Sequence, residues 1–401
     1  MSISNNYYNN ILKEKIIFLI LIFLWFPILF SSYLPGKTEI FPFGLLTIFF
    51  LNIKNATRIF FLSFFCFIYT LFINPKSEVL AFLSSYIPFI NVFLIYFFCK
   101  NIDFKLNFKI LQNSIKIILY FTYLMFFMEL LNVDRFFFVL NPLRIDEPGG
   151  LSFTYDNRFN FFESEPSRAS IFLFILGVIS QSFFKKNNFL IINSILDIVF
   201  VRSFTGLALW ILFFLFYNKK FIIFIILLFV LIILFTFDAR FIYFTNKISQ
   251  EPTVFFQEIS IMSGHRLASV MMAVELFMEN ILGYGFVDTK IYLKNLYLLN
   301  IQRYDLFLEE QQIRVAFKKG DFSLEGFYVN ILFSLGILGF FFIIFIIKKI
   351  FFNLNKKNKL IQSAIIATTI ICFFATGKGV VYPWILFGLI HNKTVTKYFS
   401  S

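Results

Sequence analysis

Cysteine and histidine are scarce in this chain, with 3 cysteines and 2 histidines among 401 residues. Cys66 and Cys372 fall inside apolar runs and Cys99 ends one, which is not the spacing of a disulfide framework or a metal site. The sequence also contains no Asp-x-Asp pair, no His-x-x-x-His arrangement and no Walker loop. We therefore expect no metal site, no cofactor and no nucleotide site.

Apolar residues are present in large excess. Hydrophobic residues make up 59% of the chain, against about 45–50% in a typical soluble domain. They stand in long runs separated by short polar clusters, and such runs match the ~20 apolar residues that cross a ~30 Å hydrocarbon layer. The sequence therefore predicts an all-α, polytopic membrane protein in which residues 1–401 form a single membrane domain.

About twelve transmembrane helices are predicted, with eleven as the alternative because two apolar runs are short. These two runs, 189–201 and 380–391, suit half-helices or tilted helices. The first run follows Lys13 and Lys15 and has no small-residue cleavage site after it, so we predict a retained helix rather than a signal peptide. The predicted spans are 16–34, 38–53, 57–74, 79–99, 110–132, 166–184, 189–201, 203–218, 221–237, 326–347, 359–377 and 380–391.

The net charge of +13 reflects basic residues that stand between the spans rather than on one basic face, so we expect no nucleic-acid partner. With a cytoplasmic N-terminus, the short outer turns carry only Lys37, Lys76, Arg202 and Lys378. This bias is typical of cytoplasmic loops and predicts that both termini are cytoplasmic. The basic residues that then fall inside are Lys13, Lys15, Lys54, Arg58, Lys100, Lys105, Lys109, Lys185, Lys186, Lys219, Lys220, Lys348, Lys349, Lys356, Lys357, Lys359, Lys393 and Lys397.

Two long connections fall on the outer face in this topology, and they are where we expect the chemistry. The first is an outer loop over 133–165, and the second is a large periplasmic loop over 238–325, between spans nine and ten. Loops of such length are usually functional or disordered. The second loop is predicted to be partly helical, because a helical period of apolar residues ends at Gly283 and Gly285. The periodic residues are Leu267, Val270, Met271, Val274, Phe277, Met278 and Ile281.

The first candidate cluster runs from Arg158 to Glu165, Pro166 and Ser167, directly before span six. Charged groups at a membrane boundary are costly unless they pair, reach water or act on a substrate. A structural role is also open, since Ser167 suits a helix cap, Pro166 a helix start, and Glu165 the positive end of the helix dipole. Arg158 has no obvious structural task, which favours a binding role.

The second candidate cluster is Gly264-His265-Arg266, at the start of the predicted helix in the large loop. An arginine faces the helix dipole unfavourably at this position and is better tolerated if it binds an anion. Its planar fork suits phosphate and pyrophosphate. His265 could act as a general base near neutral pH, although a lone histidine is more often a bystander.

Two further segments open spans on the outer face. Arg202-Ser203-Phe-Thr205-Gly206 precedes span eight, and Glu325-Gly326-Phe-Tyr-Val-Asn330 precedes span ten. The latter is followed by Leu335-Gly-Ile-Leu-Gly339. Close helix packing explains glycines of this kind and is the interpretation we favour for them.

The order of these motifs resembles the O-antigen polymerase and O-antigen ligase family of bacterial envelopes. The resemblance covers the chain from about residue 140 to the end, and the first five spans match only as hydrophobic helices. The stretches that carry it are Arg158…Glu165-Pro-Ser167, Arg202-Ser-Phe-Thr-Gly206, Arg266 with Asn280-Ile-Leu-Gly-Tyr-Gly285, and Gly326-Phe-Tyr-Val-Asn-Ile-Leu…Leu335-Gly-Ile-Leu-Gly339.

The resemblance implies a metal-independent, inverting glycosyltransferase in the bacterial inner membrane, with its active face in the periplasm. The implied substrates are oligosaccharides on undecaprenyl pyrophosphate, and the implied partners are the lipid bilayer and a regulator of chain length. Outer-face arginines, here Arg158, Arg202 and Arg266, would bind the pyrophosphate. Glu165, His265 and Glu325 remain alternatives for the base that deprotonates the acceptor.

Three functions are compatible with this resemblance or with the helix pattern: a repeat-unit polymerase, a ligase that transfers glycan to lipid A core, and a flippase or transporter of lipid-linked oligosaccharide. Ligase-like relatives often carry a histidine where this chain has Glu325, which favours the polymerase. Transporters often show paired halves and charges near the bilayer midplane. Here the halves differ and the charges gather at the outer boundary.

Overall fold

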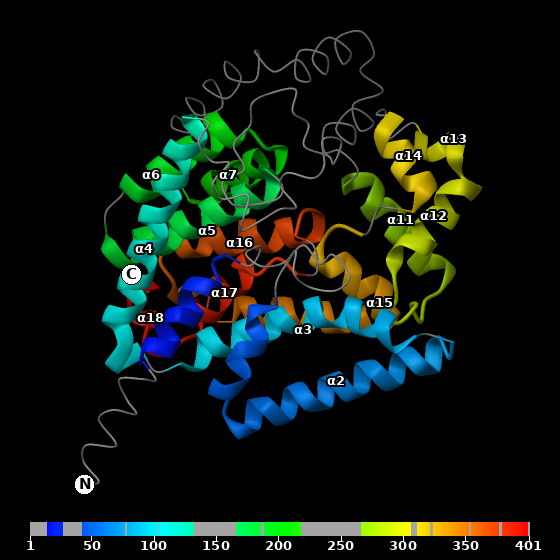
Figure 1. Cartoon of the computed structure of the whole chain (residues 1–401), viewed down its shortest axis with the longest axis horizontal. Coiled ribbons are helices and arrows are strands. Elements are labelled where there is room, and N and C mark those ends of the chain that lie inside the picture. Colours follow the sequence, from blue (N-terminus) through cyan, green and yellow to red (C-terminus); the bar gives the residue numbers. More distant parts are fainter. Residues whose placement is uncertain are drawn as a thin grey trace.

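The structure is a computed structural model. It describes residues 14–26, 42–76, 78–102, 104–131, 166–185, 188–217, 266–305, 311–320, 324–352, 354–376 and 379–399. All secondary-structure elements within these ranges are helices (Figure 1). The all-α prediction is therefore confirmed for the described residues. Predicted span 221–237, the second half of predicted span 16–34, and the outer loop 133–165 lie outside them.

Five of the described helices are long and apolar enough to cross a membrane. They coincide with predicted spans 57–74, 79–99, 110–132, 166–184 and 326–347, and by length and composition they are candidate membrane spans. The five helices are α2 (Ile53–Ile73), α3 (Val79–Asn101), α4 (Phe104–Leu130), α5 (Pro166–Phe184) and α15 (Phe327–Phe351).

The other apolar helices are shorter than a full span. Predicted span 189–201 is α6 (Asn188–Ile195) continued by the π-helix η6 (Leu196–Val201), and α7 (Phe204–Tyr217) follows. Near the C-terminus lie η8 (Leu354–Lys356), α16 (Lys359–Phe374), α17 (Tyr382–Ile390) and α18 (Thr396–Phe399). A helix as short as α17 is only about 13 Å long, so it cannot cross the bilayer alone.

The predicted helical span 38–53 is wrong within the described residues. The chain there forms the 3₁₀-helix η2 (Phe43–Phe50), whose length of about 16 Å is about half a bilayer. Gly44 lets η2 pack closely on α3, because its N–H donates to the Asn91 side chain at 2.7 Å. A Cβ at Gly44 would lie 2.4 Å from Asn91 Oδ1. Contact with α3 thus fixes one side of this apolar segment, while Leu46, Ile48 and Phe49 are exposed.

Helix α15 is broken at Gly336, which the prediction of one continuous span 326–347 did not foresee. Gly336 has φ +55° and ψ −131°, a backbone conformation outside the helical region. A Cβ at Gly339 would lie 2.5 Å from the carbonyl oxygen of Ile331, so the two halves of α15 bend back against each other. Close helix packing therefore explains Gly339, whereas Gly336 supplies the bend.

The large loop is partly helical, as predicted. Its described part contains α11 (Arg266–Glu279), α12 (Thr289–Leu299), α13 (Ile301–Asp305) and α14 (Gln311–Lys319). These helices surround their own hydrophobic cluster, which is separate from the cluster of the long helices. Helix α15 contributes Val329 and Phe333 to the cluster of the loop helices. Buried residues of this cluster include Met272, Leu276, Tyr297, Tyr304 and Phe317.

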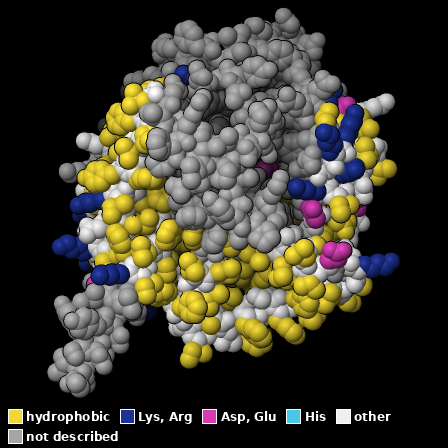
Figure 2. Space-filling model, viewed as in Figure 1, with side chains coloured by type: hydrophobic (Ala, Val, Ile, Leu, Met, Phe, Trp, Pro, Cys, Tyr) yellow, Lys and Arg dark blue, Asp and Glu magenta, His cyan; other side chains and the backbone are white. Residues whose placement is uncertain are grey.

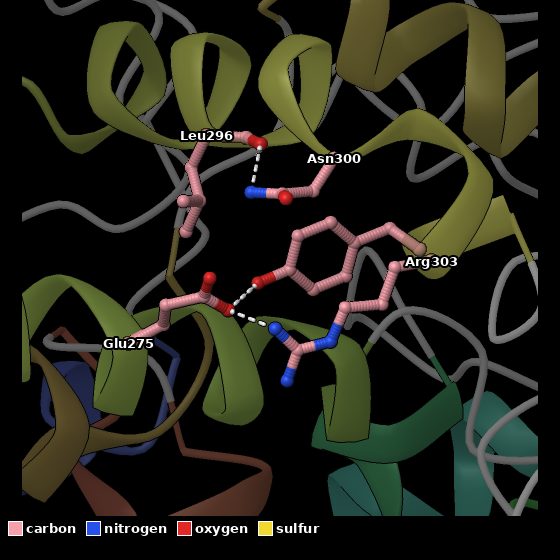
Figure 3. A network of polar contacts seen from close by, with 5 residues as sticks. Glu275, Leu296, Asn300 and Arg303 are labelled. Atoms are coloured by element: carbon pink, nitrogen blue, oxygen red, sulfur yellow. Dashed lines mark hydrogen bonds and ion pairs between the residues drawn. The ribbon is translucent and has the colours of Figure 1, made fainter.

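A polar network joins α11 to α13 on the outside of this cluster (Figure 3). Glu275 accepts hydrogen bonds from the Tyr304 hydroxyl and from Arg303 Nη1, the latter at 3.1 Å. Asn300 donates to the Leu296 carbonyl at 3.5 Å beside it. The Arg303–Glu275 ion pair is partly exposed and contributes little by itself, about 0–1 kcal/mol. The buried Tyr304 ring anchors the network to the cluster.

The surface matches a membrane environment along α2. Only 11% of the most apolar window of α2 is buried. Hydrophobic side chains gather along the edge of the molecule that α2 forms (Figures 1 and 2). By contrast, 83% of the corresponding window of α5 is buried, so α5 is a central helix of the bundle.

Candidate functional site

The first turn of α5 meets the first residue of α11. Arg266 Nη2 donates a hydrogen bond of 2.8 Å to Ser167 Oγ. Ser167 is buried and Arg266 is half-buried. Two of the motifs predicted to matter, 165–168 and 264–266, are thus in direct contact although they are far apart in sequence.

The start of α15 lies against the same turn of α11. Ser269 is fully buried one turn after Arg266, and its hydroxyl accepts a 3.0 Å hydrogen bond from the Glu325 N–H. Asn330 holds the bend before α15, since its Nδ2 donates to the carbonyls of Leu324 at 2.9 Å and Gly326 at 2.8 Å. Glu325 is therefore positioned about one helical turn from Arg266.

The start of α7 reaches α5 one turn beyond Ser167. Ser170 Oγ donates to Asp197 Oδ1 at 2.5 Å, and it lies 2.5 Å from Ser203 Oγ. A hydroxyl has a single proton to donate, so the Ser203 hydroxyl is the donor to Ser170. Ser203 also caps α7, because its Oγ accepts from the Gly206 N–H at 2.8 Å.

Arg202 lies at the edge of this region. Its backbone is left-handed, with φ +52°, and its N–H donates to the Asp197 carbonyl at 2.9 Å. Its side chain turns back on η6, where Nε donates to the Val199 carbonyl at 2.8 Å, and it is exposed. Arg202 therefore lies next to Ser203 in the chain, and the hydrogen bond of its side chain goes to Val199.

Four helix starts converge through these contacts. Ser167 belongs to the first turn of α5, Ser203 caps α7, Arg266 begins α11, and Glu325 precedes α15. Each helix N-terminus carries partial positive charge, which favours an anion. Arg266 adds a full positive charge with a planar fork. The arrangement can bind a phosphate-like anion beside a carboxylate.

Asp197 is a member of this region that the sequence prediction missed. It is 1% exposed, and its second oxygen accepts a 2.7 Å hydrogen bond from Trp210 Nε1. Gly206 leaves room for it, since a Cβ there would lie 2.8 Å from both carboxylate oxygens. The sequence signal was available: Asp197 is the only charged residue in predicted span 189–201, and such residues within membrane helices are usually functional.

Three predicted site residues, Arg158, Glu165 and His265, lie outside the described residues, so their roles stay predictions. Within the described ranges, no three His, Cys, Asp or Glu side chains gather where a metal ion could bind. The metal-independent mechanism also stays a prediction.

Compared with family models, curated proteins and solved structures, the chain matches none of them significantly.

Proposed function

We propose that this chain is an O-antigen repeat-unit polymerase, a metal-independent glycosyltransferase that joins oligosaccharides carried on undecaprenyl pyrophosphate. The observation that supports this most directly is the contact between Arg266 and Ser167, with Glu325 held nearby through Ser269. A cation for the departing pyrophosphate and a carboxylate for the acceptor proton are two groups that such a transfer needs.

The proposed reaction is a single displacement. The acceptor hydroxyl attacks the anomeric carbon of the donor sugar, and the bond from that carbon to the pyrophosphate oxygen breaks. The leaving oxygen takes the electron pair, so negative charge grows on the pyrophosphate. Arg266 and the helix starts around it stabilise that charge, and Arg158 and Arg202 are the further arginines proposed for it. One displacement inverts the anomeric configuration.

The proton of the acceptor hydroxyl passes to a base, for which Glu165, His265 and Glu325 remain candidates. Glu325 has the advantage of a defined place, since Ser269 fixes its backbone beside the turn that carries Arg266. A carboxylate at that point can reach an acceptor sugar bound next to the pyrophosphate.

The proposed orientation has both termini in the cytoplasm and the site in the periplasm. In support, Lys100 of α3 and Lys349 of α15 lie over the same Tyr96 ring, at 5.7 and 5.8 Å. Basic ends of two long helices thus meet on one side, which the positive-inside rule assigns to the cytoplasm. A reporter fused after Lys186 should report cytoplasm and one fused near Lys290 periplasm; the reverse pattern contradicts the orientation.

A transporter of lipid-linked oligosaccharide is the second candidate, because broken helices such as α15 are typical of transporter sites. In this chain, however, the broken backbone is bonded to a turn of the protein itself. Ile337 N–H donates to the Ile281 carbonyl at 2.8 Å, and Gly285 N–H to the Ser334 carbonyl at 2.9 Å. The break is therefore filled by protein, which favours the enzyme.

Gel electrophoresis of lipopolysaccharide from cells with and without the gene tests the proposal. A polymerase predicts that the mutant loses the ladder and keeps core plus one repeat. Bare core with long glycan stranded on the lipid carrier indicates the ligase instead. Bare core with single repeats trapped on the cytoplasmic side indicates the flippase. An unchanged ladder contradicts all three assignments for this polysaccharide.

A further inference from the structure

The turn that follows α11, residues 280–287, is hydrogen-bonded to three helices, α2, α3 and α15. On α2, Tyr69 Oη donates to the Leu282 carbonyl, and Thr70 Oγ1 accepts from the Phe286 N–H at 3.0 Å. On α3, Ser85 Oγ donates to the Val287 carbonyl at 2.8 Å. In Figure 1 this turn runs down from α11 to the ends of α2 and α3.

The turn also occupies the break in α15. The Tyr284 N–H donates to the Phe333 carbonyl at 2.9 Å, and the two rings stack with centroids 4.9 Å apart. Gly283 allows this approach, since a Cβ there would lie 2.5 Å from the Gly336 nitrogen. Non-helical backbone is tolerated at membrane depth only where protein or enclosed water satisfies its polar groups. The hydrogen bonds between the turn and α15 satisfy backbone polar groups at the break in this way.

The depth of the turn follows from its partners on the two candidate spans. Tyr69 lies about 6 Å along the axis from the last residue of α2, and Ser85 about 9 Å from the first residue of α3. These two ends, the C-terminal end of α2 and the N-terminal end of α3, are joined by the short connection between the helices. If α2 and α3 cross the bilayer, Leu282 and Val287 therefore lie inside its outer layer.

Helix α11 turns its most apolar side away from the protein. The buried residues of this helix are mostly small: Ala268, Ser269, Met272, Ala273 and Leu276. The periodic apolar residues of the sequence lie on the opposite side, and they are half-buried or exposed. Met278 is 71% exposed and Leu282, in the turn, is 51% exposed.

This outward side carries no charge within the described part of α11. At 100° per residue, Glu275 and Glu279 lie about 100° and 140° around the helix from Val274. Glu275 faces α13, where it accepts hydrogen bonds from Tyr304 and Arg303. An uncharged side rich in Val, Met, Ile and Leu suits a hydrocarbon environment.

The turn also connects the apolar side of α11 to α2, whose apolar side chains are largely exposed. The Leu282 carbonyl accepts a hydrogen bond from Tyr69 on α2, and the side chains of Leu282, Phe65 and Phe72 are all exposed. α2 is a candidate span of which little is buried in the protein. The turn thus joins the exposed apolar side of α11 to the exposed apolar side chains of α2.

From this continuity we propose that the outward side of α11 and the turn after it contact the acyl chains of the bilayer. Val274, Met278, Ile281 and Leu282 form this lipid-facing side. The segment, predicted from the sequence as part of a periplasmic loop, is on this proposal a re-entrant element that begins at Arg266 and dips into the membrane.

Site-directed spin labelling of the purified chain in lipid vesicles tests the proposal. Single labels are placed by Val274→Cys, Met278→Cys and Leu282→Cys, because the three native cysteines are fully buried and are expected to react slowly. Phe61→Cys, exposed in the middle of α2, is the lipid control. Gln302→Cys, exposed on α13, is the aqueous control. Collisions are measured with oxygen, which concentrates in lipid, and with a water-soluble nickel chelate.

The proposal predicts that the labels at 274, 278 and 282 match the α2 control, with frequent oxygen and rare nickel collisions. Nickel collisions as frequent as those at position 302 would overturn it, because the side would then face water. Protection from both reagents at these sites would also overturn it, because another protein surface would then cover the side. Since the substituted positions are exposed, the three variants should fold like the native chain, and each gives an independent reading.

Discussion

Arg266 donates a 2.8 Å hydrogen bond to Ser167 across 99 positions of sequence. This contact joins the first residue of α11 to the first turn of α5, and it fixes where the guanidinium points. In the proposed polymerase, Ser167 is a positioning residue: it does not touch the reacting atoms, but it aims the fork that holds the pyrophosphate.

Replacing Ser167 by alanine should slow glycan transfer while leaving Arg266 in place. Misplacing a binding group by about 1 Å can cost on the order of 100-fold in rate, so we expect a loss of about tenfold or more. Ser167→Thr keeps the hydroxyl and is the matched control. Transfer between lipid-linked repeats in isolated membrane vesicles measures the effect, and a native rate for Ser167→Ala would show that the contact has no part in catalysis.

Asp197 should be a major determinant of stability. Asp197→Ala leaves the Ser170 hydroxyl and the Trp210 indole without their buried acceptor, at a cost of about 1–3 kcal/mol for each. Asp197→Asn retains one acceptor oxygen and should cost less. Thermal unfolding of the purified chain in detergent, followed by tryptophan fluorescence, measures both. Equal midpoints for native chain and Asp197→Ala would contradict the network.

Gly336→Ala should destabilise the fold more than Gly320→Ala. Both glycines have positive φ, +55° and +82°, which costs an L-residue about 1–2 kcal/mol. At Gly320 the nearest atom to a new Cβ is a flexible lysine carbon at 3.3 Å, whereas at Gly336 it is the Ile281 carbonyl oxygen at 2.2 Å. A larger drop in unfolding midpoint for Gly336→Ala reflects this contact with the turn together with the non-helical backbone at Gly336, where ψ is −131°. Equal midpoints would mean that the turn does not fill the break.

The Tyr304–Glu275 contact should give a pH-dependent contribution to stability. Burial, and then the hydrogen bond to Glu275, raise the pKa of Tyr304 above its ordinary value. That ordinary value is about 10, so the contribution is fully present below about pH 10 and is lost as the pH rises toward the folded-state pKa. Tyr304→Phe removes it. The gap in unfolding midpoint between native chain and variant should therefore shrink above pH 10, and a constant gap would contradict the assignment.

How much the sequence could predict differs between elements. The helices α2, α3, α4 and α5 were predicted because long apolar runs have few alternatives once water is excluded. The segment 38–53 was misassigned for the same reason, since hydropathy cannot distinguish lipid from an α3 surface that binds Gly44. The break at Gly336 was missed because it depends on hydrogen bonds to the turn 280–287, which lies far from it in the sequence.

Some features of the candidate site could likewise be predicted from the sequence, and others could not. Helix-start chemistry drew attention to Arg266, and to Ser167 as a helix cap, while the resemblance pointed to Glu325; in the structure Arg266 contacts Ser167, and the Glu325 backbone lies one turn along α11. The orientation of α11 could not be predicted, because periodicity shows that a helix has an apolar side but not what that side contacts. Asp197 was passed over although a lone acid in an apolar run is itself a signal.

Complementation of the deletion strain with Arg266→Ala tests the central claim most directly. Arg303→Ala, which removes a partly exposed arginine paired with Glu275, is the matched control. We predict that Arg266→Ala, like Arg158→Ala, reaches normal levels in the membrane and leaves core plus a single repeat, whereas Arg303→Ala restores the ladder. Arg266→Lys should restore it only in part, because a point charge replaces the fork. Native chain lengths from both Arg266→Ala and Arg158→Ala would contradict the assignment of these arginines to the pyrophosphate.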